Sequence, residues 1–294
     1  MAKIGGFKND KARERYMGCY RALEDLWPTS VSVTPLDVET SYGSTRIRKF
    51  GSGSGTPMVL IHPISGTGHA WAPFAETFAS DRTVYALDTI GTAGKSVQTA
   101  PMTEGADYAR WIGDVLDALD LESAHLFGYS EGAWHAALAG AGISERLASL
   151  TLGEPGAAVG KVSKKLLWRM IRLGMRPTNE GFAKFNAWLS PGIELSAVEV
   201  DCARASLGYR RRTPWQSPLK DEQLQSISCP TYAFFGAETV LADPKIGAER
   251  ITANVLGART EIIEGGGHSV LWQMPGSVVP AVMEFVRSHD EVTA

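Results

Sequence analysis

The chain has 294 residues, and its 29 Lys and Arg against 32 Asp and Glu give a formal net charge of -3. Hydrophobic residues make up 44%, so the chain is globular in composition and long enough to bury a sizeable core without disulfides or metals. The near-neutral charge argues against nucleic acid as a partner. No stretch approaches about 18 consecutive apolar residues, so we expect no membrane span and no membrane partner.

The N-terminal residues and the cysteines favour a cytoplasmic location. Residues 1–20 carry charges throughout and contain no apolar core of a signal peptide, so we expect no export signal. Cys19, Cys202 and Cys229 are an odd number, widely spaced and without a CxxC pair. This pattern argues against a disulfide framework or a zinc site, and we expect free thiols in a reducing compartment.

The first half of the chain predicts a helix followed by short strands. Apolar residues at three-to-four spacing indicate a helix up to about residue 26: Tyr16, Tyr20, Leu23 and Trp27. Two paired strands follow at 31–38 and 45–50. Continuous apolar runs, typical of strands buried on both faces, lie at 57–61, 83–87, 124–129 and 148–152, with a helix at 106–119. Strands alternating with helices imply a parallel sheet with helices on both sides.

The alternation breaks after Pro155. Residues 156–220 show helical patterns but no buried strand, and they carry 12 Lys and Arg against 4 Asp and Glu. The alternation then resumes with strands at 230–235 and 260–263 and helices at 245–254 and 278–289. We therefore expect an α/β core formed by 1–155 and 221–294, interrupted by a helical cap or lid at 156–220. The insertion begins where ligands bind in open α/β sheets, at the carboxyl ends of strands.

The segment Gly128-Tyr129-Ser130-Glu131-Gly132 follows an apolar strand and opens a helix of small residues. A serine on such a sharp turn has strained backbone geometry and an exposed hydroxyl, and the glycines avoid collisions across the turn. The spacing alone arises often by chance, but the strand before it and the helix after it favour a nucleophile elbow. We predict Ser130 as a nucleophile, rather than a purely structural glycine turn.

A serine nucleophile needs a base. His268 ends a Gly-Gly-Gly-His loop after the last predicted strand, and the glycines would let the imidazole turn back over Ser130. It also follows the serine in the chain, which is the order found with such elbows. His125, in the strand before the elbow, and His135, on the helix after it, are better explained as packed or surface side chains.

Backbone N–H groups must hold the oxyanion that forms in acyl transfer. One donor is expected to be Glu131, the residue after the nucleophile. The second is expected in the loop after the strand at 57–61, where Ile64 is our candidate because Pro63 has no N–H.

These landmarks, together with His62 and its glycine-containing loop, resemble the α/β-hydrolase superfamily over the whole chain. The helix ending in Leu26-Trp27-Pro28 and the segment Asp88-Thr89-Ile90-Gly91 resemble a branch of bacterial carboxylesterases that includes naproxen-esterase-like enzymes. The resemblance implies the α/β-hydrolase fold, with a mostly parallel eight-stranded sheet flanked by helices and a helical lid after strand 6. It also implies a serine hydrolase that forms an acyl-enzyme.

The acid of the triad departs from the usual pattern of the superfamily. Its usual place, three residues after the glycine that ends the seventh strand, holds Thr239. Glu154 follows the sixth strand, where some members such as haloalkane dehalogenases place the acid. We therefore predict Glu154 as the acid that fixes the tautomer of His268. Glu238, one residue early, and Asp243, in the context of a helix N-cap, remain alternatives, as does a chain with no working acid.

The predicted lid is both apolar and basic. It has too many apolar side chains for a segment that is fully exposed to solvent. We therefore expect some of them to pack on the core and some to line a substrate pocket with Trp168, Trp188 and His62. Its Lys and Arg form either a solvated face or a surface that attracts anionic substrates. The Trp and Met content leaves a lid-mediated homodimer open.

The sequence therefore predicts a serine hydrolase that cleaves a carboxylic ester or related acyl bond of a small, largely apolar molecule, without a metal or organic cofactor. Two alternatives stay open. The same site could cleave a thioester, a lactone or a C–C bond, or act as a lyase or cyclase, because the fold does not choose the reaction. The protein could also be a non-catalytic ligand-binding member of the fold.

Overall fold

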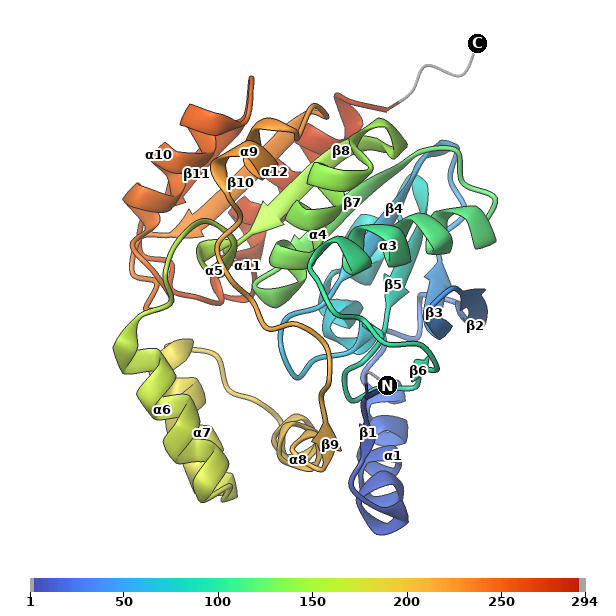
Figure 1. The fold of residues 1–294 in the computed structure, drawn as a ribbon, viewed down its shortest axis with the longest axis vertical. Helices are drawn as coiled ribbons and strands as arrows, with labels where there is room; N and C mark the ends of the chain where they lie inside the picture. The colour runs from blue at the N-terminus through green and yellow to red at the C-terminus, as the bar shows by residue number, and fades with distance from the viewer. Residues whose placement is uncertain (1–2, 291–294) are drawn as a thin grey trace.

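The computed structural model describes residues 3–290, which form a central sheet covered by helices (Figure 1). The strands of the main path follow the order β11-β10-β8-β7-β4-β5-β3-β2, and a short β6 pairs with β3. Their bounds are β2 (Val33–Thr40), β3 (Gly43–Phe50), β4 (Gly55–Ile61), β5 (Arg82–Leu87), β6 (Val97–Gln98), β7 (Ala124–Tyr129), β8 (Leu147–Gly153), β10 (Thr231–Gly236) and β11 (Arg259–Ile263).

All neighbouring strands from β5 to β11 pair in parallel, whereas β3 pairs antiparallel with β2, β5 and β6. The expected mostly parallel, eight-stranded sheet is therefore confirmed, with the two-residue β6 as an addition at one edge. In β7 and β10 every residue is buried, as continuous apolar runs predict for strands covered on both faces.

Helices cover both faces of the sheet. One apolar cluster joins one face to α3 (Ala106–Ala118), α4 (Glu131–Gly142) and α10 (Pro244–Asn254). A second cluster joins the opposite face to α11 (Val270–Gln273) and α12 (Pro275–Arg287). The remaining short helices are η1 (Gly68–Phe74), α2 (Ala75–Phe78), η2 (Ser144–Arg146), α5 (Gly156–Val159) and α9 (Asp221–Gln225).

Residues 156–220, the predicted insertion, carry three longer helices, α6 (Lys164–Met175), α7 (Asn179–Leu189) and α8 (Ala197–Ser206). In Figure 1, α6 and α7 form a hairpin beside the core, while α8 lies near α1 (Asp10–Glu24). The sequence patterns missed a second sheet here, in which β9 (Tyr209–Arg210) pairs antiparallel with β1 (Gly6–Phe7). Two residues per strand are too few for a visible alternation. The division into core and lid stays a prediction.

The N-terminal helix α1 is tied to both the insertion and the sheet. Tyr16, Tyr20 and Leu23 pack in one cluster with Cys202 of α8. The Tyr20 hydroxyl donates to the Asp88 carboxylate at 2.8 Å, and the same carboxylate accepts from Arg48 of β3 at 2.8 Å. Cys202 carries a free thiol, as do Cys19 and Cys229.

Besides His268, four histidines are buried in this fold: His62, His69, His125 and His135. Burial lowers the pKa of each below the ordinary value, in the case of His69 to about 3. His135 is the clearest case, because its ring stacks 4.0 Å from that of Tyr108 and neither of its nitrogens has a hydrogen-bond partner among residues 3–290. The folded chain therefore keeps these imidazoles neutral.

We expect the free energy of unfolding to fall as the pH is lowered from about 7 to about 5. The unfolded chain binds protons on these histidines near pH 6.5, whereas in the folded chain their protonation is shifted to lower pH. Each histidine that stays neutral in the folded chain lowers the free energy of unfolding by about 1.4 kcal/mol for each pH unit below 6.5. The substitution His135→Leu removes one such group, so urea unfolding across this range should show a shallower pH dependence than the wild type. An unchanged dependence would contradict a buried, neutral His135.

Candidate active site

Ser130 lies on the sharp turn between β7 and α4. Its φ of 55° is one that residues other than glycine rarely adopt. A Cβ atom at Gly128 would come 2.1 Å from the Gly132 carbonyl oxygen, and one at Gly132 would come 2.1 Å from the Ile61 carbonyl oxygen. Both positions therefore require glycine. The amide of Ser130 donates to the Gly153 carbonyl at 2.8 Å, which ties the turn to the end of β8.

The structure brings Ser130, His268 and Glu154 together in one line of hydrogen bonds. Ser130 Oγ lies 3.0 Å from His268 Nε2, and His268 Nδ1 lies 2.8 Å from Glu154 Oε2. All three side chains are buried. Because an ionised carboxylate only accepts hydrogen bonds, Nδ1 carries the proton and Nε2 faces the serine hydroxyl as an acceptor. This arrangement can take a proton from Ser130.

Glu154 follows β8 and also has a left-handed backbone, with a φ of 53°. Its carboxylate accepts two hydrogen bonds besides that of His268. The Gly236 amide donates to Oε1 at 2.6 Å, and the Thr239 hydroxyl donates to Oε2 at 2.5 Å. Thr239, at the position where the superfamily usually has its acid, thus hydrogen-bonds to the carboxylate that approaches from the neighbouring strand.

The two alternative acids lie elsewhere. Asp243 caps α10, where its carboxylate accepts from the amides of Lys245 and Ile246 at 3.0 and 3.3 Å. Glu238 is exposed, and only its backbone amide is tied to the histidine loop, through the Gly266 carbonyl. Within the described part of the chain, neither carboxylate hydrogen-bonds to His268, so the geometry favours Glu154 over both.

The two predicted oxyanion donors lie at the ends of β4 and β7. Among residues 3–290, neither the Ile64 amide nor the Glu131 amide donates to a protein acceptor. Ser65, next to Ile64, has a φ of 60°, so the loop makes a tight turn there. Both amides are therefore candidates to hold an oxyanion.

The His62 side chain is buried and hydrogen-bonded to the backbone around this loop, and it does not face an open pocket. Its Nε2 accepts from the Thr89 amide at 3.0 Å, and its Nδ1 donates to the Pro63 carbonyl at 2.8 Å. Burial lowers the pKa of His62, so the ring stays neutral and can do both. With both nitrogens used and the side chain buried, His62 is a brace for the loop and does not fit the expected place in the substrate pocket.

The side chain of Glu131 forms a buried ion pair with Arg211 from the insertion. Arg211 also donates to the Tyr108 hydroxyl at 3.1 Å, to the Pro214 carbonyl at 2.8 Å and to the Thr213 hydroxyl at 2.8 Å. Burial opposes the charged guanidinium, but Glu131 and the Tyr108 hydroxyl together outweigh burial, so the pKa of Arg211 is raised. The charge beside the nucleophile is therefore neutralised by a well-bound partner.

Two further contacts hold the loop of His268, and the sequence patterns did not reveal them. The Tyr129 hydroxyl donates to the His268 carbonyl at 2.7 Å. The hydroxyl of Ser190, just after α7, lies 2.6 Å from that of Ser269. Tyr129 occupies a variable position of the elbow motif and Ser190 lies in the insertion, so no local signal marked either one.

Trp168 and Trp188, the other predicted pocket residues, lie on the α6–α7 hairpin. Trp188 contacts Lys165 and Arg169, and Trp168 contacts Arg172, each through a cation above the ring. In the described residues no ring contact or hydrogen bond joins either tryptophan to Ser130, His268 or Glu154. Their place in a substrate pocket stays a prediction.

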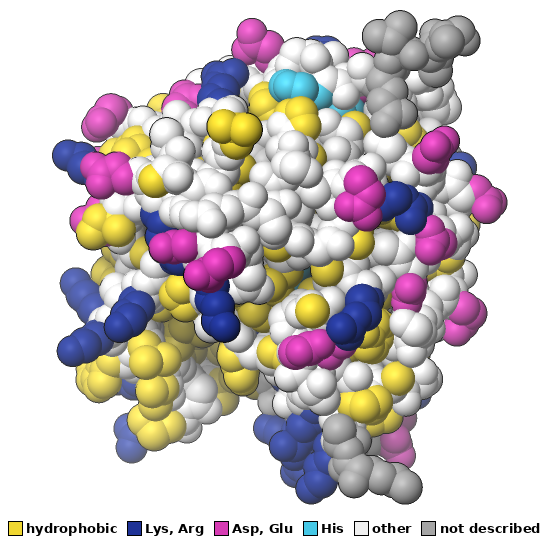
Figure 2. All heavy atoms as spheres, turned by 45° about the horizontal axis from the view of Figure 1, so that its top comes forward, with side chains coloured by type: hydrophobic (Ala, Val, Ile, Leu, Met, Phe, Trp, Pro, Cys, Tyr) yellow, Lys and Arg dark blue, Asp and Glu magenta, His cyan; other side chains and the backbone are white. Residues whose placement is uncertain are grey.

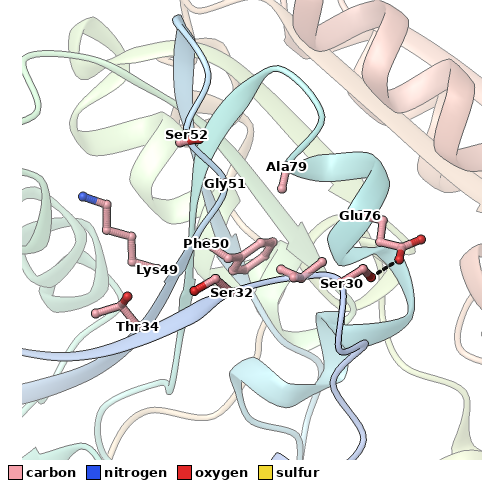
Figure 3. Close-up of a pocket in the computed structure, with 10 residues that line it drawn as sticks. Ser30, Ser32, Thr34, Lys49, Phe50, Gly51, Ser52, Glu76 and Ala79 are labelled. Atoms are coloured by element: carbon pink, nitrogen blue, oxygen red, sulfur yellow. Dashed lines mark hydrogen bonds between the residues drawn. The ribbon is translucent and has the colours of Figure 1, made fainter.

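A separate cavity of about 610 Å³ lies beside β2, β3 and α2 (Figure 3). Its walls include Ser30, Ser32, Lys49, Phe50 and Glu76. Figure 3 shows the hydrogen bond between Ser30 and Glu76, while the Lys49 side chain extends away from them. Phe50 pairs with Val84 near the start of β5, whereas the elbow lies at the carboxyl ends of the parallel strands. This cavity is therefore not part of the candidate active site.

The described residues contain no group of three or more His, Cys, Asp or Glu placed to hold a metal ion. In the same residues, no helix combines the length and the apolar character needed to cross a membrane.

The sequence pattern of the Alpha/beta hydrolase family matches residues 58–281. An uncharacterised carboxylesterase, nap, of Bacillus subtilis (strain 168) is 26% identical over 288 residues, which cover 95% of this chain and 94% of that protein. Carboxylesterase YbfK of the same organism is 26% identical over 279 residues, covering 92% and 93%.

Solved structures agree with this match. The crystal structure of carboxylesterase CesB (YbfK) from Bacillus subtilis superposes with a TM-score of 0.86 at 25% identity, over 95% of this chain and 99% of that one. That of naproxen esterase from Bacillus subtilis gives a TM-score of 0.84 at 25% identity, over 95% and 99%. The resemblance found in the sequence is thereby confirmed, and the chain belongs to the alpha/beta hydrolase family.

Proposed function

We propose that the protein is a serine carboxylesterase that cleaves the ester bond of a small, largely apolar molecule. The observation that carries the proposal is the continuous line of hydrogen bonds from Ser130 through His268 to the buried carboxylate of Glu154. The similarity to Bacillus carboxylesterases over almost the whole chain supports the same conclusion.

In the first half of the proposed reaction, Ser130 Oγ attacks the ester carbonyl while His268 Nε2 takes its proton. The amides of Ile64 and Glu131 would hold the resulting oxyanion. His268 then gives the proton to the alcohol that leaves, and an acyl-serine remains. In the second half, water attacks the acyl group with His268 again as the base, which releases the acid and restores the serine.

Glu154 would act through His268. Its carboxylate fixes the tautomer in which Nε2 is the acceptor and stabilises the imidazolium that forms when the proton moves. The hydrogen bonds from Thr239 and Gly236 hold this carboxylate in place despite the strained backbone. Thr239 is therefore proposed as a positioning residue, which keeps the acid aligned without touching the reacting atoms.

We also propose that residues 156–220 act as the cap of this site. The contact between Ser190 and Ser269, next to His268, supports this proposal, as does the Arg211–Glu131 ion pair. Both place parts of the insertion beside the elbow and the histidine loop. Such a cap would restrict the size of the acyl group that the site accepts.

The substitution Ser130→Ala is expected to abolish turnover of a ladder of p-nitrophenyl esters, with activity in the wild type highest at one acyl length. Loss of the nucleophile leaves no group that can form the acyl-enzyme. A fluorophosphonate probe should label the wild type and not the variant. A folded wild type that neither hydrolyses any ester of the ladder nor reacts with the probe would refute the proposal.

The substitution Glu154→Gln is expected to lower kcat by a factor of about 10³–10⁴, because the neutral amide neither fixes the tautomer nor stabilises the imidazolium. Circular dichroism should show an intact fold. Glu238→Gln and Asp243→Asn are the matched controls, and both should keep kcat near the wild-type value. Loss of turnover in Glu238→Gln together with normal turnover in Glu154→Gln would show that the acid is misassigned.

The substitution Arg211→Met is expected to lower kcat by about tenfold or more, because the unpaired carboxylate of Glu131 would then lie beside the developing oxyanion. The double variant Arg211→Met/Glu131→Gln removes that charge and should recover most of the loss. The comparison separates an electrostatic effect from a packing defect. Equal defects in the single and double variants would mean that Arg211 matters only for structure.

A further inference from the structure

The helix α6 carries an apolar stripe that no other part of the described chain covers. Leu167, Ile171 and Met175 follow one another at four-residue spacing and are 56%, 53% and 72% exposed, and Trp168 beside them is 59% exposed. On another side of the same helix, Leu166 is buried. Since one apolar side already packs against the protein, the exposed stripe is not needed to hold the helix in place.

Cations surround this stripe. Residues 161–190 contain seven Lys and Arg and one Glu, a formal charge of +6 in a chain whose net charge is -3. The single acid, Glu180, is already paired with Lys184. Figure 2 shows hydrophobic and Lys or Arg side chains side by side at the lower left, where the α6–α7 hairpin lies.

The arginines of α6 lack the partners that many arginines have elsewhere on the surface. Arg46, Arg146 and Arg250 each form an ion pair with an aspartate. In contrast, among residues 3–290 no ion pair involves the arginines of the hairpin, which are Arg169, Arg172 and Arg176. These unpaired charges are available to an anionic partner.

A groove of about 450 Å³ runs between α6 and α7, and these three arginines line it together with Trp168, Lys184 and Phe185. The guanidinium of Arg172 lies 5.5 Å from the centre of the Trp168 ring. The groove therefore places cations at the edge of an apolar stripe. One lipid could contact both, the cations with its headgroup and the stripe with its acyl chains.

The charge of the hairpin decides between the possible occupants. A second copy of the chain that docked through the same hairpin would bring a face of +6 against a face of +6, which is unfavourable. A nucleic acid would match the charge but offers no apolar phase for the exposed leucine, isoleucine and methionine side chains. An anionic lipid surface provides both, and a basic helix with an apolar face is the pattern that binds such surfaces.

We propose that the α6–α7 hairpin docks on anionic lipid surfaces, with its apolar stripe among the acyl chains and its cations at the headgroups. This differs from the expectation of no membrane partner, which was based only on the lack of a membrane-spanning stretch. Ser190, directly after α7, contacts the loop of His268, so docking would hold the candidate site close to the lipid. The proposal does not depend on the catalytic role of Ser130.

Flotation with vesicles tests the proposal directly. The full chain is expected to bind vesicles of phosphatidylcholine with phosphatidylglycerol, to bind pure phosphatidylcholine much more weakly, and to lose binding as salt is added. The charge reversal Lys165→Glu/Arg172→Glu should weaken binding by at least about tenfold. The matched control, Lys11→Glu/Lys49→Glu, changes the net charge equally at exposed sites on α1 and β3, outside the hairpin, and should bind more tightly than the hairpin variant.

A second pair of variants tests the apolar stripe. Leu167→Gln/Ile171→Gln should also weaken binding by about tenfold, whereas Val97→Gln/Leu256→Gln, at residues outside the hairpin that are 56% and 97% exposed, should not. Ser130→Ala should bind like the wild type, so a failure of docking and a failure of catalysis are told apart. Both control variants should keep the wild-type rate on a dissolved ester.

Three results would overturn the proposal. The first is no binding to vesicles that contain phosphatidylglycerol. The second is equal binding by the hairpin variants and their controls. The third is a dimer in sedimentation equilibrium that Leu167→Gln/Ile171→Gln converts to monomers, which would assign the face to a second copy.

Discussion

The backbone of the first turn of α4 touches the end of β4, and the rest of the site is arranged around this contact. At Gly132 even a methyl group would collide with the Ile61 carbonyl. Because the two segments meet backbone to backbone, the serine at the elbow and the loop that starts at His62 are fixed next to each other. The bond from the Ser130 amide to the Gly153 carbonyl then adds β8 to the same assembly.

The position of the acid follows from this arrangement of neighbouring strands. β8 and β10 are parallel and hydrogen-bonded, and Gly153 pairs with Phe234 at their ends. A carboxylate after either strand can therefore reach the same point in space. Glu154 approaches from β8 at the cost of a left-handed backbone, and Thr239 after β10 provides a donor for it. The Thr239 hydroxyl thus donates a hydrogen bond to the proposed acid from the position where the superfamily usually has its own acid.

The sequence predicted those parts of the fold that have a local pattern. The run at 124–129 coincides with β7, and the helix at 106–119 differs from α3 by one residue. Contacts between residues far apart in the chain leave no such pattern. The bond from Tyr129 to the loop of His268 and the use of His62 as a brace are of this kind, since each depends on how separate loops meet after folding.

The small sheet of β1 and β9 gives the first residues of the chain a role that the central sheet does not require. Gly6 and Phe7 pair with Arg210 and Tyr209, and α1 packs on α8. The start of the chain therefore holds the C-terminal part of residues 156–220 in place. If residues 156–220 act as the proposed cap, a chain shortened at its N-terminus would keep its whole central sheet and lose one support of that cap. Changes of substrate range could thus arise in evolution from the part of the chain farthest in sequence from His268.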